Sequence, residues 1–394
     1  MTISDLNIKG RRALVRVDFN VPLDGARKVQ DDTRIRRALP TIKTLLEGGA
    51  SVVLMSHLGR PKGASEQFSL KHIVSHLEGL LGIPVKFASD CVGDSALDVS
   101  QNLQPGEVAL LENLRFHPEE KDGDEFFAGQ LAENGDLYVN DAFGTAHRNH
   151  ASTAVIARFF PEDKAFGKLL EGEISALKKV MSKPAKPLLA IIGGAKVSSK
   201  LTILENMVDK VDKLMIGGGM AYTFMLAKGG KVGSSLVETE MVERAGIVLE
   251  KAKRSSTEIL LPEDSICADS FSAEANFEVF NSDEIKEGWM GLDIGPKACE
   301  KFIKAVTESQ TILWNGPMGV FEFEACSKGT FAVANALKEV TEKGAYTLVG
   351  GGDSVAAINA CGLADDVSYV STGGGAMLEY LEGKTLPGIA AILD

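Results

Sequence analysis

The sequence predicts an α/β protein of two lobes, each a doubly wound parallel sheet, joined by a long helix. Short apolar runs alternate with longer amphipathic segments from one end of the chain to the other. Strands that alternate with helices in this way form parallel sheets covered on both faces. The length of 394 residues also exceeds that of one ordinary domain.

The first lobe is predicted from apolar runs with strand character and from the helical patterns between them. The runs are Ala13–Val17, Val52–Met55, Val85–Phe87, Val108–Leu111 and Leu137–Val139. Apolar residues recur at helical spacing in Thr33–Leu46 and in Ser69–Leu81.

The boundary between the lobes is predicted near Pro184. The second half of Pro161–Ser182 has helical spacing, and the prolines of KPAKP that follow stop a helix. A helix joining two lobes would suit a hinge. We expect the domains to span 1–170 and 186–379, with the connecting helix and hinge over 171–185. One continuous sheet is the alternative.

The second lobe repeats the alternation of strands and helices. Its predicted strands are Leu188–Ile192, Lys213–Ile216, Glu258–Leu261, Thr311–Leu313, Thr347–Val349 and Ser368–Val370. Helical patterns cover Val197–Val208 and Lys328–Val340.

Composition describes a soluble globular protein, with 44% hydrophobic and 24% charged residues. The net charge of −12 argues against nucleic-acid or anionic-membrane partners. No apolar run is long enough to span a membrane, and the N-terminus does not resemble a secretory signal. The five cysteines are scattered without a C-x-x-C pair, so we expect reduced thiols, a cytoplasmic location and no structural metal cluster.

Arginine and glycine are distributed unequally between the two halves. Eleven of thirteen arginines and all six histidines precede residue 160, whereas all three GGG runs follow residue 190. Guanidinium groups suit carboxylates and phosphates, and glycine lets backbone amides approach a polyphosphate. The two halves therefore predict sites for two different ligands.

In the first half, charged or polar residues follow the predicted strands, and ligands of parallel sheets bind at these strand ends. Arg34 also opens the first helix, where the helix dipole adds to the stabilisation of an anion. The resulting anion site would consist of Asp18, Asn20, Arg34, His57, Arg60, Arg115 and Arg148.

In the second half, glycine loops follow five strands and predict a nucleotide site. The loops are GGAKVSSK, GGGMAYTF, WNGPMGVFE, GGGDSVAA and STGGGAM. None contains G-x-G-x-x-G, which disfavours a nicotinamide dehydrogenase. Gly383-Lys384-Thr385 lacks the first glycine of a P-loop and is read as a turn. His72 and His76 have a metal-ligand spacing, but the apolar pattern of their helix predicts that they face solvent.

Phosphoryl transfer would need this combination of groups, because it depends on positioning and charge neutralisation. We expect Lys196 and Lys200 to lie one helical turn apart, facing the same phosphates. Asp353 could hold Mg²⁺, and Ser354 could cap a helix beginning near Val355 while donating to a phosphate. A plain N-cap pair at Asp353 and Ser354 is the alternative.

Eight strings in this sequence resemble those of the phosphoglycerate kinase family. In order they are RVDFNVP, SHLGRP, LLENLRF, NDAFGTAHR, GGAKVSSK, WNGPMGVFE, GGGDS and STGGGA. They run from Arg16 to about Gly388 and so cover essentially the whole chain. The one visible variation is Ser354, where many members carry threonine, and either residue supplies the hydroxyl.

The resemblance implies two Rossmann-like lobes and a cytoplasmic monomer that acts in glycolysis and gluconeogenesis. The enzyme would transfer the acyl phosphate of 1,3-bisphosphoglycerate to ADP, reversibly and with Mg²⁺, giving 3-phosphoglycerate and ATP. Transfer would be in line, after the lobes close. The C-terminal tail, about 380–394, would return to pack on the first lobe.

The resemblance also implies residue roles. The glycerate would be held by Asp18, Phe19, Asn20, Arg34, His57, Leu58, Gly59, Arg60, Arg115 and Arg148. The nucleotide would be held by Gly194, Lys196, Lys200, Gly217, Gly218, Gly219, Asn315, Pro317, Glu322, Gly351, Gly352, Asp353, Ser354, Gly373, Gly374 and Gly375. Glu322 would bind the ribose and Asp353 the Mg²⁺.

The expected catalytic residues are Arg34 and Lys196, which would meet across the moving phosphoryl group. No general base is expected, because the attacking oxygen of ADP is already anionic. Two other functions stay open on the residues alone: a binding protein without catalysis, and a two-lobed kinase acting on another acid or a sugar.

Overall fold

The computed structural model describes residues 1–394, which form two compact units. The first comprises Met1–Ser175 together with Thr385–Asp394, and the second comprises Ala176–Lys384. Helix α6 (Lys168–Met181) contains the point at which the first unit gives way to the second.

The first unit is built on a six-stranded parallel sheet of order β3-β4-β2-β1-β5-β6. Its strands are β1 (Arg12–Arg16), β2 (Ser51–Met55), β3 (Val85–Phe87), β4 (Val108–Leu110), β5 (Leu137–Asn140) and β6 (Lys164–Phe166). Five of them match the predicted strands to within one residue at each end. The sixth, β6, was not predicted.

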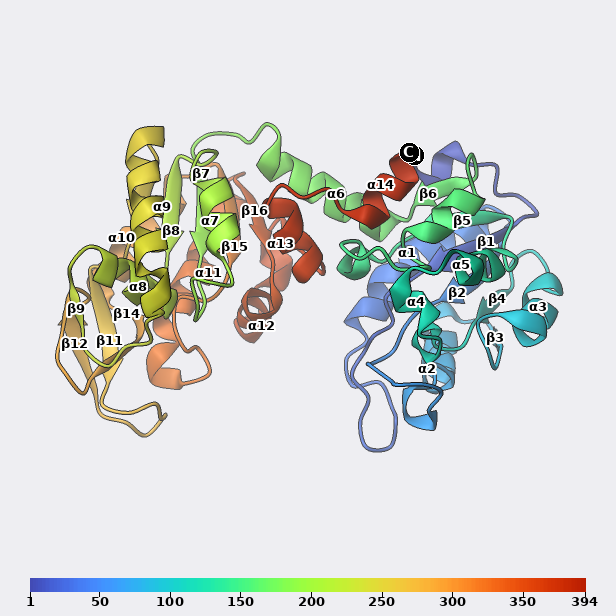
Figure 1. The fold of residues 1–394 in the computed structure, drawn as a ribbon, viewed down its shortest axis with the longest axis horizontal. Coiled ribbons are helices and arrows are strands. Elements are labelled where there is room, and N and C mark those ends of the chain that lie inside the picture. The colour runs from blue at the N-terminus through green and yellow to red at the C-terminus, as the bar shows by residue number, and fades with distance from the viewer. The chain divides into compact units, whose positions relative to one another are not determined.

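The helices of this unit are α1 (Thr33–Glu47), α2 (Lys71–Leu81), α3 (Gly93–Gln101), α4 (Glu119–Asp122), α5 (Glu125–Ala132), the first part of α6, and α14 (Pro387–Leu393). Figure 1 shows α14, the red C-terminal helix, beside β6 of the blue-to-green unit. The amide of Gly388 at its first turn donates to the carbonyl of Ala146 at 2.9 Å. The last ten residues thus belong to the first unit.

The second unit has a six-stranded parallel sheet of order β10-β8-β7-β15-β16-β17. Its strands are β7 (Leu188–Ile192), β8 (Lys213–Ile216), β10 (Glu258–Leu260), β15 (Thr311–Asn315), β16 (Tyr346–Val349) and β17 (Tyr369–Val370). All six were predicted. The two-lobed α/β fold with a parallel sheet in each lobe is confirmed.

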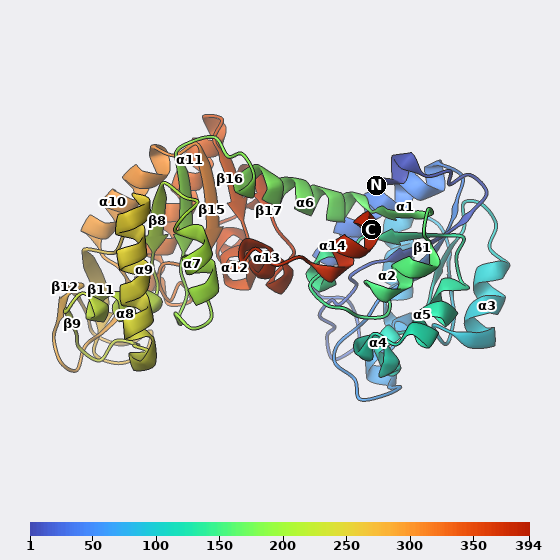
Figure 2. The ribbon, with the colours of Figure 1, turned by 45° about the horizontal axis from the view of Figure 1, so that its top comes forward.

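Seven further helices belong to the second unit: α7 (Leu201–Met207), α8 (Met220–Ala227), α9 (Val242–Ser255), α10 (Pro296–Thr307), α11 (Lys328–Glu342), α12 (Gly352–Ala360) and α13 (Gly375–Leu381). Figure 2 shows α7 and α9 in front of the sheet, with α10 and α11 behind it. None of the helices in either unit has the length and apolar character needed to cross a membrane.

A second, smaller strand region lies mostly between β10 and α10, and β9, which precedes α9, joins it. Strands β11 (Asp264–Ala268), β12 (Phe277–Asn281) and β14 (Met290–Ile294) form an antiparallel sheet, and β9 (Lys231–Val232) pairs with β13 (Glu284–Ile285). The sequence reading missed these strands. Because β12 is largely exposed, it lacks the continuous apolar run by which the buried strands were recognised.

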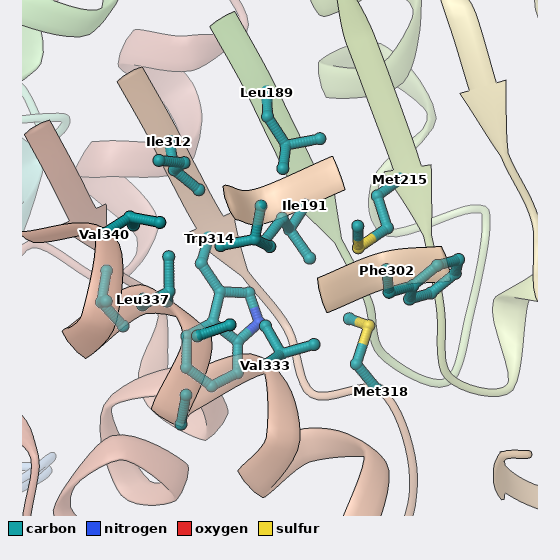
Figure 3. Packing of buried hydrophobic residues seen from close by; sticks show 14 of the residues in the cluster. Leu189, Ile191, Met215, Phe302, Ile312, Trp314, Met318, Val333, Leu337 and Val340 are labelled. Atoms are coloured by element: carbon teal, nitrogen blue, oxygen red, sulfur yellow. The ribbon is translucent and has the colours of Figure 1, made fainter. Parts of the chain in front are cut away.

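One core cluster of the second unit lies between its large sheet and the helices α10 and α11. Figure 3 shows Trp314 of β15 packed near Ile191 of β7 and against Val333 and Leu337 of α11. Trp314 is fully buried, and its indole N–H donates to the carbonyl of Gly316 at 2.8 Å. The packing therefore fixes not only β15 but also the loop that leaves its carboxyl end.

Candidate functional site

Four polar loops meet at one edge of the sheet in the first unit. They follow β4, β2, β1 and β5, which are adjacent and parallel. Their carboxyl ends therefore lie side by side, as the sequence predicted. The predicted residues Asp18, Asn20, His57, Arg115 and Arg148 all stand on these loops.

Asp18, Asn20 and Gly59 connect the loops after β1 and β2. One carboxylate oxygen of Asp18 accepts a hydrogen bond from Arg34 at 2.6 Å, and the other accepts from the amide of Asn20 at 3.3 Å. The side-chain oxygen of Asn20 in turn accepts from the amide of Gly59 at 2.8 Å. Arg34 stands in the first turn of α1, as predicted. These bonds hold the Arg34 guanidinium at the loop edge.

Asn113, which sequence reasoning missed, connects the loop after β4 to the loop after β2. It is fully buried and accepts from the amides of Leu58 at 3.2 Å and Arg115 at 3.0 Å. Its own amide donates to the carbonyl of Leu58 at 2.8 Å. Arg115 then donates to the carbonyl of Gly59 at 2.7 Å. A buried asparagine that bonds to two loops in this way positions the arginine beside it.

Arg16 is a second residue of this site that the sequence did not predict. It is 1% exposed, and its guanidinium lies 3.2 Å from Nδ1 of His57 and donates to Ser152 at 2.8 Å. The Ser152 hydroxyl donates to the buried carboxylate of Glu120 at 2.7 Å. The signal available in the sequence was a lone arginine within the otherwise apolar strand ALVRV.

The charges in this cluster are unbalanced in favour of cations. Burial lowers the pKa of His57 well below its ordinary value, and the positive charges of Arg16, Arg115, Arg34 and Arg148 lower it further. Burial, together with Arg148 and Arg16, also lowers the pKa of Arg115 to about 10. Of these four arginines, only Arg34 forms an ion pair with a carboxylate. The arrangement therefore favours an anionic ligand.

The other predicted residues of the first unit differ in their exposure. Phe19 and Leu58 are buried, so only their backbone can face a ligand. Arg60 is exposed and is not among the charges that lower the pKa of His57. His72 and His76 do not simply face solvent, since His72 bonds to the carbonyl of Glu66 at 2.7 Å and His76 to Asp32 at 2.9 Å.

Five glycine loops share one edge of the sheet in the second unit. The strands that precede them, in the order β8-β7-β15-β16-β17, are adjacent and parallel. Three of the loops are also hydrogen-bonded to one another, because Gly194 donates to Pro317 at 3.2 Å and Gly218 to Met318 at 3.0 Å. A Cβ atom at Gly193 would lie 2.1 Å from the carbonyl oxygen of Pro317, so this close approach requires glycine.

A cavity of about 540 Å³ opens beside these loops. Six of the predicted nucleotide-binding residues line it: Gly194, Gly218, Gly219, Pro317, Glu322 and Asp353. The rest of the wall is mostly apolar and includes Leu236, Phe271, Met290, Leu292, Val320 and Phe321. A pocket with one apolar wall and a few polar groups has the composition of a small-molecule site.

The remaining predicted residues of this unit do not line the cavity. They are Lys196, Lys200, Gly217, Asn315, Gly351, Gly352, Ser354, Gly373, Gly374 and Gly375. Among them, Asn315 is fully buried, contacts the amine of Lys200 and donates to the carbonyl of Gly350 at 2.7 Å.

The expected helical placement of Lys196 and Lys200 is wrong. Helix α7 begins only at Leu201, so both lysines lie in the loop that precedes it. Ser198 instead bonds to Glu238 through its amide at 2.9 Å and its hydroxyl at 2.5 Å, and such side-chain bonds compete with helix formation. Lys196 is exposed, whereas burial lowers the pKa of Lys200 to about 8, against the opposing charge of Asp353.

The predicted capping role of Ser354 is also wrong. Helix α12 begins at Gly352, and its N-cap is Gly351, whose φ of 93° suits glycine. Ser354 is fully buried, and its hydroxyl accepts a hydrogen bond from the amide of Gly316 at 2.5 Å. Asp353, one residue earlier, is exposed and forms no ion pair, so its carboxylate is available to a ligand.

A larger cavity of about 1310 Å³ lies elsewhere on the second unit, over α8, α9 and β10. None of the glycine loops reaches it. Most of the lysines in its lining are already ion-paired, as Lys251 is with Asp209 at 2.6 Å and Lys301 with Glu263 at 2.7 Å. The glycine loops therefore favour the smaller cavity as the ligand site.

A family model, relatives of similar sequence and a solved structure all match this chain over nearly its whole length. A family model described as phosphoglycerate kinase matches residues 3–384. A phosphoglycerate kinase of Herpetosiphon aurantiacus is 54% identical over 394 residues, covering 100% of this chain and 99% of the relative. A cytosolic phosphoglycerate kinase of Triticum aestivum is 51% identical and covers 99% and 97% of the two chains. The solved phosphoglycerate kinase of Coxiella burnetii is 41% identical, with a TM-score of 0.91 and coverage of 100% and 98%.

Proposed function

The chain belongs to the phosphoglycerate kinase family, and we propose that its first unit binds the phosphorylated acid and its second unit the nucleotide. The family is a kinase of glycolysis that transfers phosphate to a carboxylate acceptor. The reaction passes the acyl phosphate of 1,3-bisphosphoglycerate to ADP and is reversible.

The observation that carries this proposal is the excess of cations in the first unit. Arg16, Arg34, Arg115 and Arg148 surround His57, and only Arg34 is paired with a carboxylate. A ligand with a phosphate at one end and a carboxylate or acyl phosphate at the other would neutralise this charge. We assign Asp18 and Asn20 to hold the loops and to meet the hydroxyl of the glycerate.

The cavity of the second unit supports the assignment of the nucleotide. Its apolar wall suits a flat base, Glu322 at its rim suits the ribose hydroxyls, and the glycine loops offer amides to phosphates. Lys200, half-buried beside Asn315, would neutralise part of the phosphate charge. These roles rest on the placement of the residues around the cavity.

Asp353 has the properties of a Mg²⁺ ligand for the nucleotide. Its carboxylate is exposed, lines the cavity and forms no ion pair, and Mg²⁺ prefers oxygen ligands of this kind. When bound, the ion would neutralise charge on the nucleotide phosphates. We expect Asp353→Asn to raise the Mg²⁺ concentration needed for half-maximal activity, and the exposed Asp365→Asn to leave it unchanged.

The cationic side chains of the two units suit catalysis by positioning of the substrates and neutralisation of charge. Arg34 and Lys196 are the side chains that we assign to the moving phosphoryl group, whose charge spreads over its oxygens in the transition state. No residue is required as a general base, because the attacking oxygen of ADP is anionic. Closure of the two units on their ligands stays a prediction.

The test is a coupled assay with purified protein, ATP, 3-phosphoglycerate and Mg²⁺. We expect product formation that needs all three additions. Separate titrations with 3-phosphoglycerate and with ADP, followed by calorimetry, distinguish the rival functions. Binding of both ligands without turnover would favour a binding protein, and turnover with another acid or a sugar in place of 3-phosphoglycerate would favour a different kinase.

We also propose that the protein acts as a cytoplasmic monomer. One relative is named as cytosolic, and the reaction requires only one copy of each unit. Light scattering after size exclusion should give the mass of a single chain, and a dimer mass at low protein concentration would contradict this.

A further inference from the structure

Asp90, Cys91 and His117 form a cluster in the first unit that has no part in the proposed reaction. One possible ligand atom from each residue lies within 4.8 Å of those of the other two. The Nε2 atom of His117 is 2.7 Å from a carboxylate oxygen of Asp90. The sequence predicted no metal cluster, because the cysteines are scattered, and only the fold brings His117 to Asp90 and Cys91.

The fold fixes each of the three side chains in place. Asp90 accepts a hydrogen bond from the amide of Cys91 at 2.7 Å, which orients its carboxylate. The ring of His117 packs against Phe127, with their centroids 5.1 Å apart. Cys91 is fully buried and stands just before Val92, the N-cap of α3. Burial and the negative charges of Asp90 and Glu120 raise the pKa of its thiol, so the sulfur is a thiol until a cation displaces the proton.

The chemistry of this set matches that of a borderline divalent ion. Zn²⁺ accepts cysteine sulfur, histidine nitrogen and aspartate oxygen together, and a site with three protein ligands leaves one position for water. Hard ions such as Mg²⁺ prefer oxygen ligands alone and would not favour this set. Asp90 and His117 are partly exposed, which gives an ion access from solvent to the buried sulfur.

We propose that Asp90, Cys91 and His117 bind a Zn²⁺-like divalent ion at a site separate from the nucleotide's Mg²⁺. Binding releases the Cys91 thiol proton to solvent and replaces the Asp90–His117 hydrogen bond with two bonds to the ion. The Nε2 atom of His117 then offers its lone pair, with the ring proton on Nδ1. The proposal does not rest on the proposed function.

The site adjoins the arginine cluster through the chain. Arg115 lies in the short 3₁₀ turn Leu114–Phe116, and His117 is the residue that ends this turn. An ion on His117 would therefore hold the carboxyl end of the segment that presents Arg115. This connection gives the site a route by which metal binding could affect the binding of the acid.

The experiment uses Cd²⁺ as a spectroscopic probe for the full-length protein, in the presence of excess Mg²⁺. Cadmium bound to a thiolate gives an ultraviolet charge-transfer band. We expect one equivalent of Cd²⁺ to produce this band, and Zn²⁺ to remove it by competition. No band in the wild-type protein, or a band that excess Mg²⁺ abolishes, would overturn the proposal.

Three variants locate the site. Cys91→Ser should lose the band, and His117→Gln should weaken Cd²⁺ binding by roughly tenfold or more while leaving the cysteine in place. Cys91→Ser changes a buried side chain and could disturb the core. The side chain of His117 is partly exposed, so His117→Gln tests the site without that risk. Cys361→Ser, at a half-buried cysteine elsewhere, should behave as wild type. Unchanged binding in His117→Gln would overturn the proposal, since Asp90 and His117 would then form only an ion pair.

Discussion

The hydroxyl oxygen of Ser354 lies 2.5 Å from the amide nitrogen of Gly316 and accepts its hydrogen bond. Both residues are buried; Ser354 stands in the first turn of α12, and Gly316 stands in the loop that follows β15. Gly316 also provides the carbonyl to which Trp314 donates at 2.8 Å. The hydroxyl of Ser354 thus helps to fix the loop that follows β15, which lines the nucleotide cavity.

We expect Ser354→Ala to destabilise the protein, because it leaves the buried amide of Gly316 without a partner. The free energy of unfolding should fall by about 1–3 kcal/mol, the cost of one unsatisfied buried donor. Urea denaturation measures this, and Ser354→Thr should be close to wild type because it keeps the hydroxyl. Equal stability of the alanine and wild-type proteins would show that the bond does not support the loop.

Nucleotide binding should be linked to protonation of Lys200. Burial lowers the pKa of this lysine from 10.5 to about 8, so near pH 8 part of the unliganded protein carries it uncharged. The phosphates of ADP would favour the charged form, and the complex should therefore take up a fraction of a proton. Calorimetry at pH 8 in two buffers with different ionisation enthalpies measures this uptake.

Lys200→Met should abolish that proton uptake, and Lys210→Met, at an exposed lysine, should not. The same shift has a consequence for stability. Because the folded pKa is depressed, the unfolded chain binds the proton more tightly, and the contribution of Lys200 to stability rises as the pH increases from about 8 to 10.5. If proton uptake on ADP binding persists in Lys200→Met, another group than Lys200 takes up the proton.

Arg34 and Arg36 form a matched pair for testing catalysis on one helix. Both stand in the first turns of α1 and both are ion-paired, Arg34 with Asp18 and Arg36 with Asp32. Arg34→Ala should lower kcat by about 100-fold or more, the usual cost of losing one group that stabilises transition-state charge. Arg36→Ala should retain near-normal kcat. Similar activities of the two variants would remove Arg34 from the catalytic role.

Asp293 should make stability depend on pH. Its carboxylate accepts from the amide of Gly329 at 2.8 Å, its other oxygen has no partner, and burial raises its pKa from 3.8 to about 7. A raised carboxyl pKa means that the folded state holds the proton more tightly. The stabilisation that protonated Asp293 gives to the folded state is fully present below pH 3.8 and is lost as the pH rises through about 7.

Asp293→Asn should remove this part of the pH dependence, because the amide stays neutral and can still accept from Gly329. Chemical denaturation at a series of pH values gives the slope of stability against pH. The exposed Asp365→Asn serves as the control and should keep the wild-type slope. An identical slope in Asp293→Asn would show that the carboxyl titrates normally.

The sequence alone predicted most of the architecture and the position of both candidate sites. Buried parallel strands are continuous apolar runs, so the five runs of the first half and the six of the second were visible without coordinates. Because ligands bind at the carboxyl ends of such strands, the loops after them could be named as well. A largely exposed strand such as β12 carries no such signal.

Tertiary structure decided what each loop residue does. Ser354 points into the core rather than capping its helix, and Lys196 and Lys200 stand in a loop because Ser198 bonds to Glu238 instead of continuing the helix. Arg16 becomes part of the cation cluster only when β1 and β2 pair and bring it to His57. Asp90 and Cys91 meet His117 in the same way. Such contacts depend on packing between distant segments, which local sequence patterns do not encode.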